Sequence, residues 1–141
     1  MSDTWTHAHN AVGRWAWAYD ESDLEMFADS VTADARVTIE TGNGPVEVLR
    51  GRDTIRSFFG DRLLARPAGL PRRHVTTLVT IDEGEREATV LSYLTLYTFV
   101  DRAPQLVTTG WYRDRIVDEG DMWRIADRHV HLDVAELPEP Y

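Results

Sequence analysis

Residues 70–81 read Leu-Pro-Arg-Arg-His-Val-Thr-Thr-Leu-Val-Thr-Ile, and here the chain changes from helical to strand-like patterning. β-Branched residues dominate this run, which is typical of a strand. It contains His74, the only histidine outside the first ten and last thirteen residues. Because imidazole titrates near neutral pH, His74 is the first candidate for proton transfer. The alternative is a structural histidine that caps a neighbouring backbone group.

Three more strand patterns follow without an intervening helix. They cover residues 87–100, 105–117 and 122–132, and turns containing Asp, Glu, Gly or Pro separate them. Strands of this length twist strongly. We therefore expect a sheet that curls and encloses a cavity on its concave face.

The first half of the chain is mainly helical. Apolar residues at three- and four-residue spacing predict a helix over residues 4–20, a short helix from residue 24, and a third between Gly51 and Pro67. Residues 34–41 and 46–49 alternate around a Gly-Asn-Gly turn, which predicts a hairpin. This order predicts an α+β fold with helices gathered on one face of an antiparallel meander.

Composition limits the classes of function. A chain of 141 residues with 43% hydrophobic content fits a single domain spanning residues 1–141. Its 24 acidic residues outnumber 15 basic ones, none of them lysine, which argues against nucleic-acid or membrane partners. With no cysteine and no secretory or membrane-spanning pattern, we expect a cytoplasmic protein.

A second candidate site lies at the end of the first predicted helix. Tyr19 continues the apolar stripe, and Asp20 follows it, either at the cavity mouth or in solvent. If Asp20 faces His74, its carboxylate accepts one ring N–H and fixes the tautomer. The other ring nitrogen is then free to move a proton.

Five short segments together resemble the SnoaL-like family of the nuclear transport factor 2-like superfamily, over almost the whole chain. They are WAYDESDL (17–24), GRDTI (51–55), RHVTT (73–77), WYRD (111–114) and WRIADR (123–128). The sequence is similar to scytalone dehydratase, polyketide cyclases, and related dehydratases and dehydrochlorinases. The resemblance implies a cone-shaped α+β barrel with an internal pocket, an acid–base pair of His74 and Asp20, and Tyr19 holding a substrate oxygen.

Two departures limit what the resemblance implies. Scytalone dehydratase has a second histidine in the strand that contains Ser92 here, and the dehydrochlorinase has a lysine about where Trp15 stands. The resemblance therefore does not imply either of these two specific reactions for this chain. The expected function is cofactor-free dehydration, isomerisation or cyclisation of an apolar or polyketide-like small molecule. The alternative is a non-catalytic ligand-binding module, or a partner protein like the β subunits of ring-hydroxylating dioxygenases.

Other side chains are candidates for the cavity wall. Aromatic rings suit planar ligands, hydroxyls bind ligand oxygens, and an arginine stabilises negative charge on a substrate. Each type also has a structural alternative in the core, in a strand, or in a solvated charge ladder. The substrate-binding candidates are Trp17, Phe58, Phe59, Thr76, Ser92, Thr109, Trp111, Arg113 and Arg128.

We expect neither a metal nor a cofactor. His129 and His131 lie two residues apart on one strand face, but a metal site needs further ligands and a second shell. We do expect a homodimer or a higher homo-oligomer. An open curved sheet leaves an apolar outer face, to which we assign Tyr93, Tyr97 and Phe99.

Overall fold

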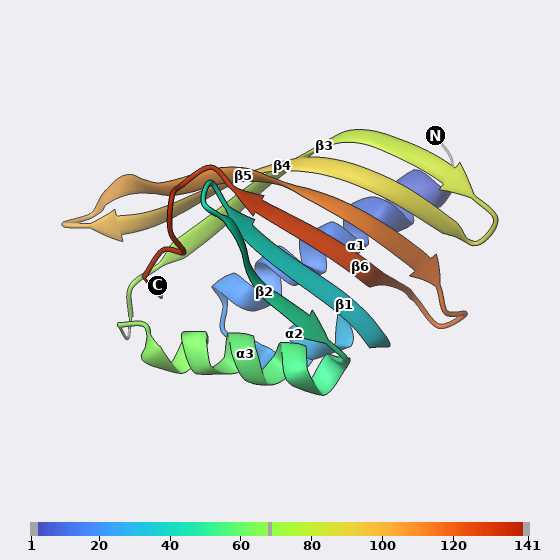
Figure 1. Ribbon diagram of the computed structural model, residues 1–141, viewed down its shortest axis with the longest axis horizontal. Helices are drawn as coiled ribbons and strands as arrows, with labels where there is room; N and C mark the ends of the chain where they lie inside the picture. The colour runs from blue at the N-terminus through green and yellow to red at the C-terminus, as the bar shows by residue number, and fades with distance from the viewer. Residues whose placement is uncertain (1–2, 68, 140–141) are drawn as a thin grey trace.

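The computed structural model describes residues 3–67 and 69–139. Its elements are α1 (Asp3–Asp20), α2 (Leu24–Asp29), β1 (Val31–Thr41), β2 (Gly44–Arg50), α3 (Arg52–Ala65), β3 (Arg72–Gly84), β4 (Glu87–Val100), β5 (Ala103–Asp118) and β6 (Trp123–Leu132). The predicted α+β class is confirmed, and the long strands bend over the helices (Figure 1). None of the helices in the described ranges has the length and hydrophobicity that crossing a bilayer requires.

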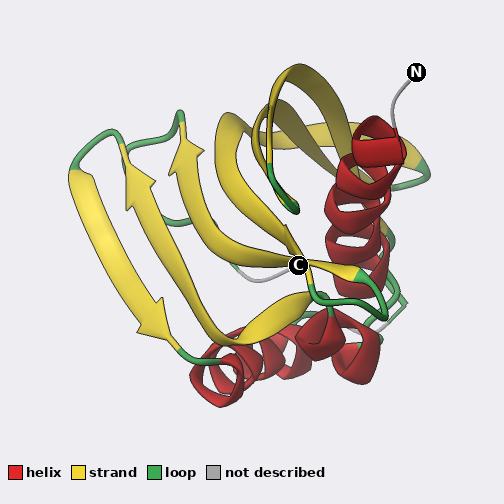
Figure 2. Cartoon of the chain, turned by 90° about the vertical axis from the view of Figure 1, so that its right-hand side faces the viewer, coloured by secondary structure: helices red, strands yellow, loops and turns green. Residues whose placement is uncertain are grey.

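The strands form one six-stranded sheet in the order β2-β1-β6-β5-β4-β3. Neighbouring strands are antiparallel except β1 and β6, which run parallel. The predicted hairpin of β1 and β2 thus adds two strands to the sheet next to β6, the last strand in sequence. β2 and β3 are the two edges, so the sheet curls without closing, and Figure 2 shows the helices on its concave side.

The helix α1 lies across the concave face and packs mainly against β3. The apolar stripe predicted from the sequence is its buried side, on which Ala8, Ala11, Val12, Trp15 and Tyr19 lie. The helix α3 packs against β1 and β2 at the other end of the curl. The two helices therefore cover different parts of the concave face.

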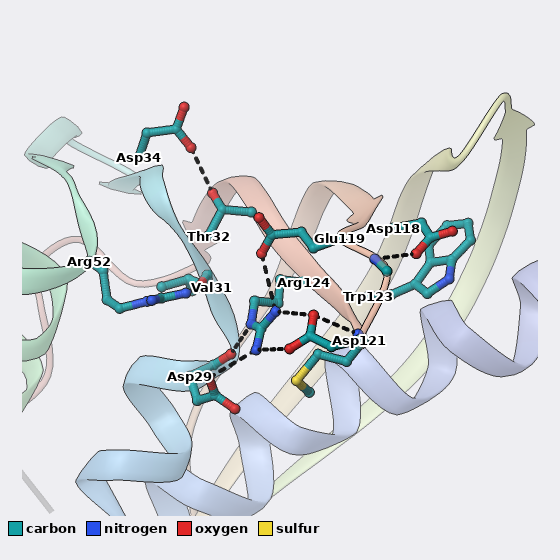
Figure 3. Close-up of polar contacts among 12 residues, drawn as sticks. Asp29, Val31, Thr32, Asp34, Arg52, Asp118, Glu119, Asp121, Trp123 and Arg124 are labelled. Atoms are coloured by element: carbon teal, nitrogen blue, oxygen red, sulfur yellow. Dashed lines mark hydrogen bonds and ion pairs between the residues drawn. The ribbon is translucent and has the colours of Figure 1, made fainter.

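An ion-pair cluster fixes α2 to one end of the sheet (Figure 3). Arg124 of β6 donates to the Asp29 carboxylate at 3.0 Å and to the two Asp121 carboxylate oxygens at 2.8 and 3.0 Å. Glu119 lies 3.3 Å away. Hydrogen bonding to Asp121, more than any other contact, raises the pKa of Arg124 above its ordinary value. Since this cluster lies away from the cavity described below, its role is structural.

The strands β5 and β6 approach each other closely at Gly110. A Cβ atom at this position would lie 2.0 Å from the carbonyl oxygen of His131. That distance is far below van der Waals contact, and the obstacle is backbone that cannot rotate away. Only glycine therefore fits between the two strands here.

We predict that Gly110→Ala lowers the free energy of unfolding by about 2 kcal/mol or more, because the strands must separate. Gly13→Ala is the matched control: Gly13 lies within α1, and its Cβ would meet nothing within 4 Å. Higher helix propensity should make this variant more stable by about 0.5–1 kcal/mol. Urea denaturation measures both, and equal stability of Gly110→Ala and the parent would contradict the close approach.

Candidate active site

Asp20 and His74 are in direct contact, at the end of α1 and the beginning of β3. The His74 ring nitrogen Nδ1 lies 2.6 Å from Asp20 Oδ1, and the His74 backbone N–H donates to Asp20 Oδ2 at 2.7 Å. Their side chains are 8% and 6% exposed. One carboxylate thus holds both the backbone and the ring of His74.

This double contact decides which ring nitrogen can react. A carboxylate accepts hydrogen bonds, so the neutral imidazole carries its proton on Nδ1 and leaves the lone pair on Nε2. The Tyr19 ring packs edge-on against the imidazole, with centroids 5.2 Å apart. The nitrogen available to a ligand is therefore Nε2, on a ring whose orientation is fixed.

His74 belongs to the wall of a cavity that lies between the concave face of the sheet, α1, α3 and the C-terminal segment, residues 133–139. The wall is mainly apolar, and the predicted candidates Phe58 and Phe59 are part of it. Its polar members are Arg62, Arg72, His74, Thr108 and Glu139. The other members are Trp15, Tyr19, Ile39, Leu94, Leu96, Tyr112, Val130, Leu132, Leu137 and Pro138.

The C-terminal segment closes one side of the cavity. Thr41 donates to the carbonyl oxygen of Ala135 at 2.9 Å, and Arg62 of α3 donates to that of Pro138 at 2.8 Å. Leu137 packs against the core. Side chains and backbone of this segment thus complete a wall that the sheet and helices leave open.

Arg72 is a cation in the cavity wall that the sequence analysis did not single out. It is fully buried, its guanidinium lies 4.3 Å above the Tyr19 ring, and Nη2 donates to the Tyr19 carbonyl oxygen. Burial lowers the pKa of Arg72 to about 10, so it stays charged at neutral pH. Strand alternation offered a signal, since Arg72 precedes His74 by two residues and shares its face.

Three predicted wall residues of β5 lie on the outer face instead. Thr109 donates to Asp133 at 2.6 Å, Trp111 stacks on two histidines of β6, and Arg113 is exposed. The inward residues of this strand include Thr108 and Tyr112. The prediction was wrong by one position, and a shift of one residue exchanges the two faces of a strand.

Trp17 is also outside the cavity wall, with 62% of its surface exposed. It follows Trp15 by two positions, which turns it by about 200° to the opposite side of the helix. The prediction that Trp17 lines the cavity was therefore wrong, although the aromatic run that contains it forms part of the wall through Trp15.

The candidates Thr76, Ser92 and Arg128 are on the concave side but outside the cavity wall. Arg128 is fully buried and donates to the Asp114 carboxylate at 2.7 and 2.8 Å, so its charge is neutralised in the core. Ser92 is fully buried, and Thr76 is half-buried. The cavity occupies only part of the concave face and does not reach these three residues, so their assignment to substrate binding stays a prediction.

The histidine pair on β6 contacts one carboxylate. His129 Nε2 and His131 Nδ1 lie 3.2 and 2.7 Å from the two oxygens of Glu40 on β1. Hydrogen bonding from His131 is the main cause that lowers the pKa of Glu40. Within residues 3–67 and 69–139, no group of histidine and acidic side chains is arranged to hold a metal ion.

Comparison with known proteins supports the same architecture. A model of the SnoaL-like domain matches residues 5–129. The chain belongs to the SnoaL-like domain family. This match includes Asp20, Arg72 and His74, whereas the C-terminal segment that closes the cavity lies beyond it. No curated protein matches the sequence at a significant level.

Solved structures with a similar fold extend the SnoaL-like comparison. ActVI-ORFA from Streptomyces coelicolor is 20% identical with a TM-score of 0.78, covering 94% of this chain and 98% of that one. A Catenulispora acidiphila protein in complex with S-DNPA is 24% identical with a TM-score of 0.74, covering 91% and 92%. A protein described as the β subunit of an aromatic-ring-hydroxylating dioxygenase, from Novosphingobium aromaticivorans, is 16% identical with a TM-score of 0.75, covering 96% and 95%.

We predict that neutral His74 carries its proton on Nδ1, because Asp20 accepts from that nitrogen. Long-range ¹H–¹⁵N correlation spectra of the imidazole distinguish the two tautomers. Asp20→Asn should move the equilibrium toward the Nε2–H form, since an amide can donate to Nδ1. The exposed His9 provides an internal reference that this substitution should not affect. An Nε2–H tautomer at His74 in the parent would contradict the arrangement.

Proposed function

We propose that this SnoaL-like protein is a small-molecule lyase, isomerase or cyclase that uses His74 and Asp20 for cofactor-free acid–base chemistry. The observation that carries the proposal is that one carboxylate accepts hydrogen bonds from both the ring and the backbone of a histidine in a cavity wall. A positioned base of this kind typically contributes about 10²–10⁴-fold to the rate of a proton transfer.

The roles follow from the contacts. Nε2 of His74 takes a proton from a carbon next to an activating group, and the Asp20 carboxylate stabilises the imidazolium that forms. Tyr19 is in the cavity wall, and its phenol oxygen makes no hydrogen bond to a described residue, so it is free to donate to a substrate oxygen. The protonated His74 then returns the proton at another atom, which completes an isomerisation, a cyclisation or the loss of water.

Tyr112 is a second phenol in the same wall. Burial raises its pKa to about 12, which keeps the hydroxyl neutral at physiological pH. A neutral phenol donates a hydrogen bond and does not act as a base. We therefore assign proton abstraction to His74 alone and give Tyr112 a binding role.

The substrate we propose is an apolar or polyketide-like metabolite. The wall consists mainly of aromatic and aliphatic side chains, which favour ring systems over charged or highly hydroxylated molecules. Binding of S-DNPA by a protein with the same fold supports a small-molecule ligand.

A non-catalytic role is the alternative. Similarity to a dioxygenase β subunit supports the same fold in a partner protein, but at 16% identity it concerns the fold alone. A hydrogen-bonded acid–histidine pair in the wall of a cavity is better explained by proton transfer than by association with another subunit. The enzyme is therefore our first proposal.

We also propose that two copies associate through the outer face of the sheet. Val75 of β3, Tyr93 of β4 and Leu106 of β5 share this face and are 52%, 58% and 59% exposed. Tyr97 and Phe99 have the same strand parity and are half-buried. Association would remove this apolar surface from water, and a symmetric dimer is the simplest closed arrangement.

We predict that the parent protein accelerates deuterium exchange at the α-carbons of cyclic aromatic ketones such as 2-tetralone, measured by NMR in D₂O. His74→Ala should lower the enzymatic rate by about 10²-fold or more, because the base is lost. Asp20→Asn should also slow exchange, whereas His129→Ala on the outer face should not. Exchange at the parent rate in His74→Ala would exclude His74 as the base. A parent that accelerates exchange of no ketone tested would favour the binding module.

For the dimer, we predict a sedimenting mass of twice the chain mass for the parent. Tyr93→Glu should give one chain mass, since two like charges would meet at the interface. Leu64→Glu is the control, because Leu64 on α3 is 87% exposed but lies away from the sheet. A monomeric parent would contradict the proposal.

A further inference from the structure

We infer that the ligand of this cavity is an organic acid, with an apolar ring system against the aromatic wall and a carboxylate held by Arg72. The reaction that follows binding rests on the proposed function, and this inference adds to it the chemical class of the substrate. The binding itself follows from the unpaired donors of Arg72.

The guanidinium of Arg72 has more donors than its surroundings use. Of its five N–H groups, one at Nη2 is directed to the Tyr19 carbonyl oxygen. Its Nε and Nη1 atoms are buried and have no hydrogen-bond partner among residues 3–67 and 69–139. Buried charged donors without a partner are costly and rare in folded proteins. An acceptor from a bound molecule would complete the site.

The charge of Arg72 is also incompletely balanced. Its nearest acid is Asp20, with Nε 3.6 Å from Oδ1, but His74 already occupies both oxygens of that carboxylate. Arg62 adds a second positive charge to the same wall, whereas the carboxylate of the exposed Glu139 opposes it. A ligand carboxylate therefore meets an under-neutralised guanidinium in a mainly apolar surrounding, where the attraction is strong.

A purely structural role would leave these donors unexplained. To hold the end of α1, Arg72 needs only its contacts with Tyr19, which are the hydrogen bond to the carbonyl oxygen and the packing of the guanidinium over the ring. The structural Arg128 also has one buried nitrogen without a partner, Nη1, but its Nε and Nη2 both donate to the Asp114 carboxylate. Arg72 resembles it in burial but lacks such a partner and, unlike Arg128, belongs to the cavity wall.

The test compares carboxylates with neutral amides of the same shape. Isothermal titration calorimetry at neutral pH would measure binding of benzoate, 2-naphthoate, benzamide and 2-naphthamide to the full chain. We expect at least one carboxylate to bind the parent tenfold or more tightly than its amide. Arg72→Gln should reduce the ratio below about threefold. Arg73→Gln should keep it, since Arg73 is the exposed neighbour on the opposite face.

The outcomes separate this inference from the proposed function. Equal binding of carboxylate and amide by the parent, no binding of either, or a preference that persists in Arg72→Gln would overturn it. If Arg72→Gln does not fold, Arg72→Lys should retain a reduced preference, and an unchanged ratio would also count against the inference. His74→Ala should lose ketone exchange, and that readout reports on the proposed function alone. A carboxylate preference in a parent that exchanges no ketone would leave the binding inference standing without the proposed function. Exchange activity without any preference in the parent would leave the proposed function standing alone.

Discussion

The Asp20 carboxylate connects the end of α1 to the beginning of β3, and the position of the cavity depends on this connection. Its two oxygens bind the ring and the backbone of His74, 54 residues further along the chain. Arg72 reinforces the junction by donating to the carbonyl oxygen of Tyr19 in the last turn of α1, which also accepts from the Ser22 backbone N–H at 3.2 Å. The groups that attach the helix to the sheet are thus the same groups that give the cavity its chemistry.

The interior contains two arginines with similar burial and different surroundings. Arg128 is paired with Asp114 and lies over the rings of Tyr112 and Trp15, at 3.8 and 4.6 Å from their centroids. Arg72 shares its nearest carboxylate with a histidine. Pairing, more than burial, therefore separates a core ion pair from a residue that remains available to a ligand.

The spacing of apolar residues was sufficient to predict the helices, the strands and the fold class, because this spacing is a local property of the sequence. It was insufficient to decide which face of β5 points inward, because each face carries an aromatic and a charged residue: Trp111 and Arg113 on one, Tyr112 and Asp114 on the other. The inward face is the one on which Asp114 pairs with Arg128 of β6, a contact that spacing within β5 does not reveal. Arg72 was missed because a charged residue at a strand end normally faces water. Only the packing of α1 against β3 buries it.

The parallel pair of β1 and β6 has a consequence for how the chain is made. Thr38 of β1 is opposite His129 of β6, so β1 cannot pair with β6 until the segments between them and β6 itself have been translated. Until then, β1 and β2 form a hairpin without a neighbour, and the hairpin edge is open to pairing with other chains. Folding dominated by such distant contacts is slow. The nascent chain therefore cannot complete the cavity, whose wall includes Val130 and Leu132 of β6, before that strand has been translated.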